Sequence, residues 1–106
     1  MAIYIQLLTL SPEGREKALE DPESILRAQG SISVPGVQVL GIYSVLGECD
    51  FVNIVEASDN TAMARFSMEL GVRAGAHITT MPAIPIGRME EAEGQGLAKL
   101  ETEAAT

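Results

Sequence analysis

The sequence predicts an α+β fold in which one antiparallel sheet carries helices on a single face. Three features of the chain predict it. A β-hairpin pattern occupies Val37–Glu56, where two runs rich in Val and Ile flank a short break that contains Gly47. Apolar, strand-like runs lie near the start of the chain and near residue 80, and helix-start signals lie between the strands. The predicted order of elements is therefore β-α-β-β-α-β.

The first strand is expected at residues 3–10, with alternate side chains on opposite faces of the sheet. Its wholly apolar set is Ile3, Ile5 and Leu7. We expect this set to pack against the helices, because the other set includes a glutamine.

Two proline-containing signals follow, at residues 11–13 and 21–23. A capping residue before Pro is typical of a helix start, and Pro inside a helix breaks it. The two signals therefore predict a short turn near residues 12–20 and a helix from 22 to about 31. A Val-Pro-Gly turn at 34–36 then leads into the hairpin strands, expected at 37–46 and 49–57.

A second helix is predicted over Thr61–Leu70, after the capping cluster at 58–61. Its apolar side chains repeat at helical spacing, and Gly71 is expected to end it. The last strand is predicted at Ala76–Ile84, and its proline near the end indicates an edge position.

With right-handed crossovers, this order is a ferredoxin-like sandwich whose other sheet face has no helix. The alternation places a mixed set of side chains on that face: Tyr4, Gln6, Leu8, Tyr43 or Ser44, Asn53, Val55, His77, Thr79 and Met81. A face of this size is rarely left in water. Face-to-face pairing across a two-fold axis would cover it, so we expect a homodimer, or a higher homo-oligomer, in the form of a dimeric α/β barrel.

Length and charge limit the classes of function. The 106 residues suit one domain, expected at 1–86, with an acidic tail at 87–106. The tail is either flexible or a short docking helix at 96–105, in which case it could bind a protein partner. A net charge of −8 argues against nucleic acid and against anionic membranes as partners. One cysteine and no signal-like N-terminus predict a cytoplasmic protein.

Few residues of the chain are candidates for catalysis or ligand binding. His77 is the only histidine and the best candidate for acid–base work near neutral pH, with Asp50 as the second catalytic candidate. The plainer interpretation of Asp50 is a turn residue that binds backbone N–H groups. Candidates for ligand binding are Tyr4, Gln6, Tyr43, Asn53, His77 and Thr79. Nothing in the chain predicts a cofactor or a metal site.

Several short segments of the sequence resemble the GYD-domain family of small bacterial proteins. They include the stretches at 4–7, 10–14 and 41–43, the signature region at 46–52, and shorter matches at 56–57, 79–80 and 82–83. Gly47 and Asp50 fit the Gly-Tyr-Asp element, whereas Cys49 stands where the family has tyrosine. The resemblance implies a ferredoxin-like fold that pairs as a dimeric α/β barrel, and a family activity that is largely undefined.

Three functions follow as hypotheses. The preferred one is an oligomeric binding protein that takes a small apolar or semi-polar molecule, or a partner protein, through the barrel. The second is a small cofactor-independent enzyme of the oxygenase or isomerase kind, with His77 moving protons. The third is an assembly adaptor that docks through the C-terminal tail, using Leu97 and Leu100.

Overall fold

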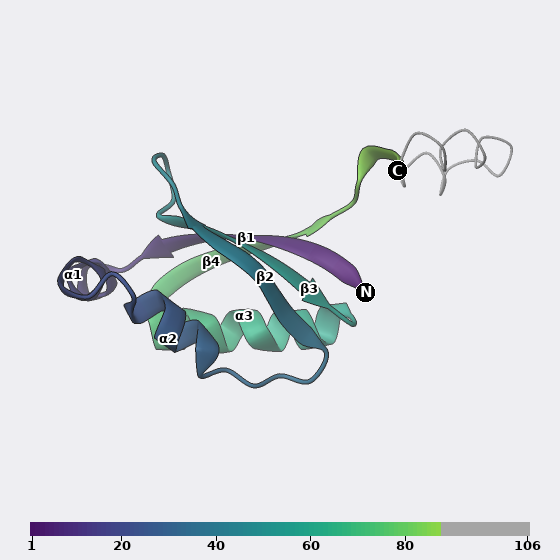
Figure 1. Ribbon diagram of the computed structural model, residues 1–106, viewed down its shortest axis with the longest axis horizontal. Helices are drawn as coiled ribbons and strands as arrows, with labels where there is room; N and C mark the ends of the chain where they lie inside the picture. The colour runs from purple at the N-terminus through teal and green to yellow at the C-terminus, as the bar shows by residue number, and fades with distance from the viewer. Residues whose placement is uncertain (88–106) are drawn as a thin grey trace, which may run out of the picture.

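The computed structural model describes residues 1–87 and confirms the ferredoxin-like α+β arrangement (Figure 1). Four strands alternate with three helices in the order predicted, except that the first helical connection is divided in two. The elements are β1 (Ala2–Leu10), α1 (Pro12–Glu20), α2 (Ser24–Gly30), β2 (Val37–Ser44), β3 (Phe51–Ala57), α3 (Asn60–Ala74) and β4 (Ala76–Ala83). The predictions for residues 88–106, including the docking helix, lie outside the described residues.

The sheet is fully antiparallel, with strand order β2-β3-β1-β4. Helices α2 and α3 cover one face, and α1 projects beyond one end of the sheet (Figure 1). β4 lies at an edge, as its proline predicted. The opposite edge strand, β2, carries an irregularity between Val39 and Gly41, where the pairing with β3 shifts register.

The helices begin and end at identifiable caps. Ser11 Oγ accepts a hydrogen bond from the Gly14 N–H at 3.0 Å, and Asp59 does the same for Ala62 at 2.8 Å. The turn expected near 12–20 is therefore a full helix of nine residues. The end predicted for α3 at Gly71 is wrong: the helix continues to Ala74 and ends at Gly75, which adopts φ 66°.

Gly71 has a different role from a cap. A Cβ built there would lie 3.2 Å from the Ala76 carbonyl oxygen, so the glycine lets α3 and the start of β4 approach closely. Sequence alone does not separate these roles, because both call for glycine near the end of a helix.

Gly14 is another point of close approach, between α1 and the end of α3. A Cβ at Gly14 would stand 2.8 Å from the Gly75 carbonyl oxygen, a backbone atom that cannot move aside. We expect Gly14→Ala to lower the free energy of unfolding by about 1–3 kcal/mol. Gly30 in α2 is the matched control, since nothing lies within 4 Å of its Cβ position. Gly30→Ala should be neutral or stabilising in the same denaturant titration, and equal effects of the two changes would contradict this packing.

The assignment of faces on the two central strands is the main correction to the sequence analysis. The helices cover Tyr4, Gln6 and Leu8 of β1, which are at most 3% exposed. The partly exposed side chains on the open face are those expected in the core: Ile3, Ile5 and Leu7. β3 is inverted in the same way, with Asn53 and Val55 fully buried.

The physical reason is that both faces of β1 are largely apolar, so hydrophobic alternation does not decide between them. The polar side chains that favoured solvent are instead hydrogen-bonded inside the core. The faces of β4 are as predicted: His77, Thr79 and Met81 are exposed. The core itself is aliphatic and aromatic, and joins α2 and α3 to the sheet through Leu8, Ile25, Val55, Met63, Phe66 and Leu70.

Candidate functional site

A cluster of buried amide side chains lies between the sheet and the helices. Asn53 Nδ2 donates to Gln6 Oε1 at 2.9 Å and to Gln29 Oε1 at 2.8 Å. Gln6 Nε2 in turn donates to Ser67 Oγ at 2.8 Å and to Thr80 Oγ1 at 3.2 Å. The cluster therefore connects β1, β3, β4, α2 and α3 through their side chains.

This cluster holds two of the residues predicted to bind a ligand, Gln6 and Asn53. A third, Tyr4, is buried beside it and donates its hydroxyl hydrogen bond to Asn60 Oδ1. The prediction that these three line the open sheet face is wrong. A role in ligand binding stays a prediction for them. The geometry gives each a structural role, because its hydrogen bond satisfies a buried polar group, and leaving that group without a partner would lower the stability of the fold.

The open sheet face brings together the other candidates. It presents the half-buried Ile3, Ile5, Leu7, Val52 and Ile54 along the two central strands, with Leu40, Tyr43, His77, Thr79 and Met81 on the edge strands. Tyr43 is 56% exposed and Leu40 51%. The face is thus more apolar than the sequence analysis expected, because aliphatic side chains replace the polar ones in its centre.

His77 lies at one end of this face, opposite Thr9 in the strand register. No ion pair to it occurs within residues 1–87. In the same range, no three His, Cys, Asp or Glu side chains gather as metal ligands. Its side chain is exposed, and its role in proton transfer stays a prediction.

Asp50 sits at the junction of β1, α1 and the hairpin. Its Oδ2 accepts a hydrogen bond from the Leu10 N–H at 2.8 Å and lies 3.7 Å from the Arg15 Nε. Its own N–H donates to the Leu8 carbonyl at 2.8 Å. These contacts match the turn-stabilising interpretation. They also bring together two of the segments that resemble the family, at 10–14 and 46–52.

Replacing Asp50 should therefore lower the free energy of unfolding. Asp50→Ala leaves the Leu10 N–H without its partner, and we expect a loss of about 1–2 kcal/mol in the free energy of unfolding. Asp50→Asn keeps an acceptor oxygen and should lose less than half of that. Thermal and urea unfolding of the two variants measure this directly. If Asn and Ala cost the same, the hydrogen bond to Leu10 is not what Asp50 contributes.

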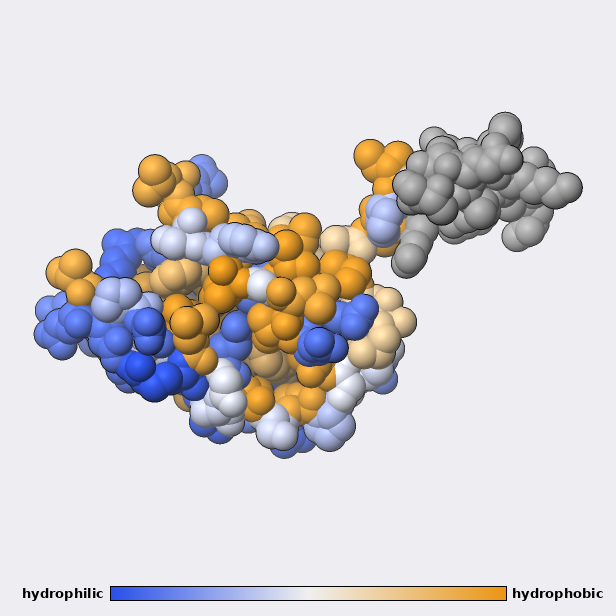
Figure 2. Space-filling view, viewed as in Figure 1, coloured by the Kyte–Doolittle hydropathy of each residue, from blue (hydrophilic) through white to orange (hydrophobic). Residues whose placement is uncertain are grey.

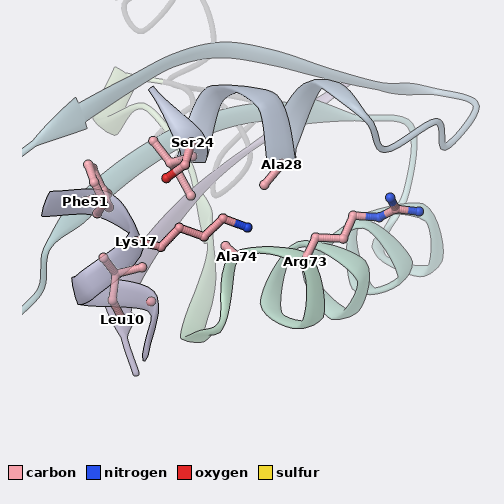
Figure 3. Close-up of a pocket in the computed structure, with 10 residues that line it drawn as sticks. Leu10, Lys17, Ser24, Ala28, Phe51, Arg73 and Ala74 are labelled. Atoms are coloured by element: carbon pink, nitrogen blue, oxygen red, sulfur yellow. The ribbon is translucent and has the colours of Figure 1, made fainter. Parts of the chain in front are cut away.

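The described residues form several hollows. The best enclosed is a cavity of about 20 Å³ between α1, α2 and α3, lined by Lys17, Ser24 and Arg73 among others (Figure 3). It has room for one water molecule and no larger ligand. A wider groove of about 390 Å³ lies between α1 and the base of the hairpin, lined by Leu10, Arg15, Ala18, Leu19, Pro22, Ser44, Val45, Asp50 and Phe51.

This second groove was missed at the sequence level, because it forms between segments that are distant in the chain. Leu46 is a large apolar residue in the hairpin turn, which also holds Gly47, Glu48, Cys49 and Asp50. The structure leaves its side chain fully exposed, and Leu19 on α1 is 85% exposed. Cys49 in the same turn is a free, partly buried thiol.

Comparison with known proteins agrees with this fold. The GYD domain model matches residues 4–92. A protein of Thermus thermophilus named "Glutamine synthetase and cystathionine beta-lyase binding protein" is 38% identical over 87 residues, which cover 81% of this chain and 92% of the relative.

Two solved structures share the fold at low identity. The leucine response regulatory protein of Mycobacterium tuberculosis superposes with a TM-score of 0.59 at 17% identity over 78% of this chain. This chain spans half the length of that regulator, 50%. A second protein of Thermus thermophilus superposes with a TM-score of 0.57 at 19% identity, covering 79% of this chain and 94% of its own. No helix within residues 1–87 is long and apolar enough to cross a membrane. Because the family model matches most of the chain, this protein belongs to the GYD-domain family.

Proposed function

We propose that this protein is a homodimeric binding protein whose partner is a metabolic enzyme, with glutamine synthetase and cystathionine β-lyase as the first candidates. The observation that carries the proposal is the relative named as a binding protein for those two enzymes, at 38% identity over 81% of this chain. A family member this similar in length and sequence makes protein binding the best-supported activity.

The surface of the fold supports a role in protein contact. Five aliphatic side chains occupy the centre of the open sheet face, while the polar groups that could orient a small molecule, Gln6 and Asn53, are buried behind it. Contiguous apolar surface of this kind marks protein interfaces. We assign this face to the second copy of the chain, because the same patch on both subunits is self-complementary across a two-fold axis.

Dimer formation through the sheet leaves the helices, the α1 end and the hairpin tip on the outside. Those surfaces are then available to an enzyme, and the proposed assembly presents two copies of each. Two equivalent binding surfaces suit capture of an oligomeric enzyme, since linked contacts raise the effective affinity.

Purified components test this function. We expect the full chain to bind glutamine synthetase or cystathionine β-lyase from its own source organism, with a dissociation constant below about 10 µM in biolayer interferometry. An unrelated enzyme of similar charge serves as the control for non-specific adsorption. Absence of binding to both enzymes at about 100 µM, ten times that constant, contradicts the proposal.

A further inference from the structure

We propose that the groove between α3 and β4 binds a small, neutral aromatic molecule that donates one hydrogen bond through an O–H or N–H group. The groove has a volume of about 420 Å³, within the size range of small-molecule sites. Its walls come from α3 and from the side chains of β4 that alternate with the open-face set. The site therefore lies apart from the face assigned to the second copy, and the inference does not depend on the partner enzyme.

The first observation is that the groove carries no charge. Within residues 1–87, none of the side chains that line it belongs to Asp, Glu, Lys, Arg or His. The α1–α2 end of the molecule, by contrast, presents a largely hydrophilic surface (Figure 2). An ion that entered the groove would lose its water without gaining a counter-ion, which is costly. A neutral molecule is therefore the favoured occupant.

The second observation is that the apolar walls contain two thioethers. Met63 is 1% exposed, Ile78 is half-buried, and Met68 is 74% exposed. Methionine side chains adapt their shape and make favourable contacts with aromatic rings. Met68 is not part of the core cluster, so a ring that packs on it would cover apolar surface that the folded chain leaves in water.

The third observation is the set of hydrogen bonds on the two hydroxyl groups of the groove. Ser67 Oγ donates to the Met63 carbonyl oxygen at 3.0 Å, so its single proton is used. In the 2.8 Å contact between the hydroxyls, Thr80 is therefore the donor and Ser67 the acceptor. Gln6 Nε2 donates to Thr80 Oγ1 at 3.2 Å. Thr80 Oγ1 then has no proton left and one free lone pair, so it can only accept a hydrogen bond from a ligand.

A second oxygen in the groove has the same character. The Tyr4 hydroxyl donates its proton to Asn60 Oδ1, which leaves the Tyr4 oxygen as an acceptor. Tyr4 is 3% exposed and lines the groove together with Thr80. Both oxygens favour a ligand that brings a donor, and phenols and indoles combine one donor with an aromatic ring.

Titration of the isotope-labelled full chain with phenol tests the site. Anisole, in which a methyl group replaces the hydroxyl proton, and benzoate, which is charged, are the matched controls. We expect saturable amide shift changes at Ser67, Met68 and Thr80 with phenol, and a dissociation constant on the order of 1 mM for a ligand of this size. Anisole should bind about fivefold more weakly because it has no proton to donate. Benzoate should cause no saturable change.

Three results of this titration would overturn the inference. They are no saturable change with phenol up to about 20 mM, roughly twenty times the expected constant; equal affinity for anisole; and changes confined to the open sheet face.

The variant Thr80→Val tests the hydrogen bond itself. It keeps the branched side chain and removes the acceptor oxygen, so phenol should bind about fivefold more weakly while the affinity for anisole stays the same. Thr61→Val is the matched control, because Thr61 is exposed in the first turn of α3 and does not line the groove. It should bind phenol as the native chain does.

Met68→Ala is a second test that leaves the hydrogen-bond network untouched. The side chain is largely in solvent, so the fold should be intact, and phenol should bind about threefold more weakly because a ring contact is lost. Equal weakening of phenol and anisole by Thr80→Val, or no effect of Met68→Ala, would contradict the proposed site.

Discussion

The substitution Ile54→Asp should separate the proposed dimer into monomers. Ile54 lies on β3, one of the two central strands, and faces the open side of the sheet opposite Ile5. In the proposed assembly the new carboxylate is buried against the partner's apolar face without a counter-ion. Such an uncompensated charge costs about 3–5 kcal/mol, so the dimer dissociation constant should rise at least about a hundredfold. Sedimentation velocity over a concentration series measures this change.

The matched control adds the same charge elsewhere. Leu26→Asp places a carboxylate at a 50% exposed position on α2, which covers the other face of the sheet (Figure 1), and should leave the association unchanged. Circular dichroism must show that Ile54→Asp remains folded, since Ile54 is only half-buried in the single chain. A folded Ile54→Asp variant that associates as tightly as the native chain would remove the sheet face as the dimer interface.

Asn53→Ala should produce the largest loss of stability among the polar side chains. The amide of Asn53 is fully buried and donates to Gln6 and to Gln29. Its removal leaves two buried carbonyl oxygens without a donor and opens a small void. We expect the free energy of unfolding to fall by about 2–5 kcal/mol, measured by urea denaturation.

The control for this variant is the loss of an exposed amide. Gln38 on β2 has its side chain in solvent, so Gln38→Ala should change stability by less than about 0.5 kcal/mol. If Asn53→Ala is as mild as Gln38→Ala, the buried amides do not hold the strands and helices together. A ligand-binding role for Asn53 would then be favoured, because its contribution to stability would not explain why the residue is buried.

Much of the fold could be predicted because its strongest signals are local. The hairpin is carried by two β-branched runs and a turn within twenty residues, and α3 by Met63, Phe66 and Leu70 on one side of a helix. The edge position of β4 follows from a single proline. Each of these features depends on neighbours in the chain, so no tertiary information is needed to see it.

The faces of β1 and β3 could not be predicted in this way. Gln6 is buried because its oxygen meets an amide 47 residues away and its nitrogen meets a hydroxyl 61 residues away. Alternation of apolar residues treats an isolated glutamine as solvent-facing, which fails when distant partners satisfy it. The role of Gly14 could not be predicted for a similar reason, because its neighbours are the backbone carbonyls of residues 74 and 75, far away in the sequence.

The candidate site likewise has parts that the local sequence predicts and parts that depend on contacts between distant segments. His77 and Thr79 lie on the open face as expected, because they flank the apolar Ile78, which faces the other side of the strand. The groove at the α1 end was not foreseen, since it forms between α1 and the base of the hairpin, which are about thirty residues apart in the chain.

The two edges of the sheet have a consequence for how copies of this chain assemble at high concentration. β2 is interrupted by its register shift near Leu40, and β4 carries Pro82, which has no N–H to offer a neighbouring strand. Both edges therefore resist strand-by-strand growth into fibrils. Because lateral extension is impeded on both sides, the proposed face-to-face pairing is the mode of self-association that these edges leave open.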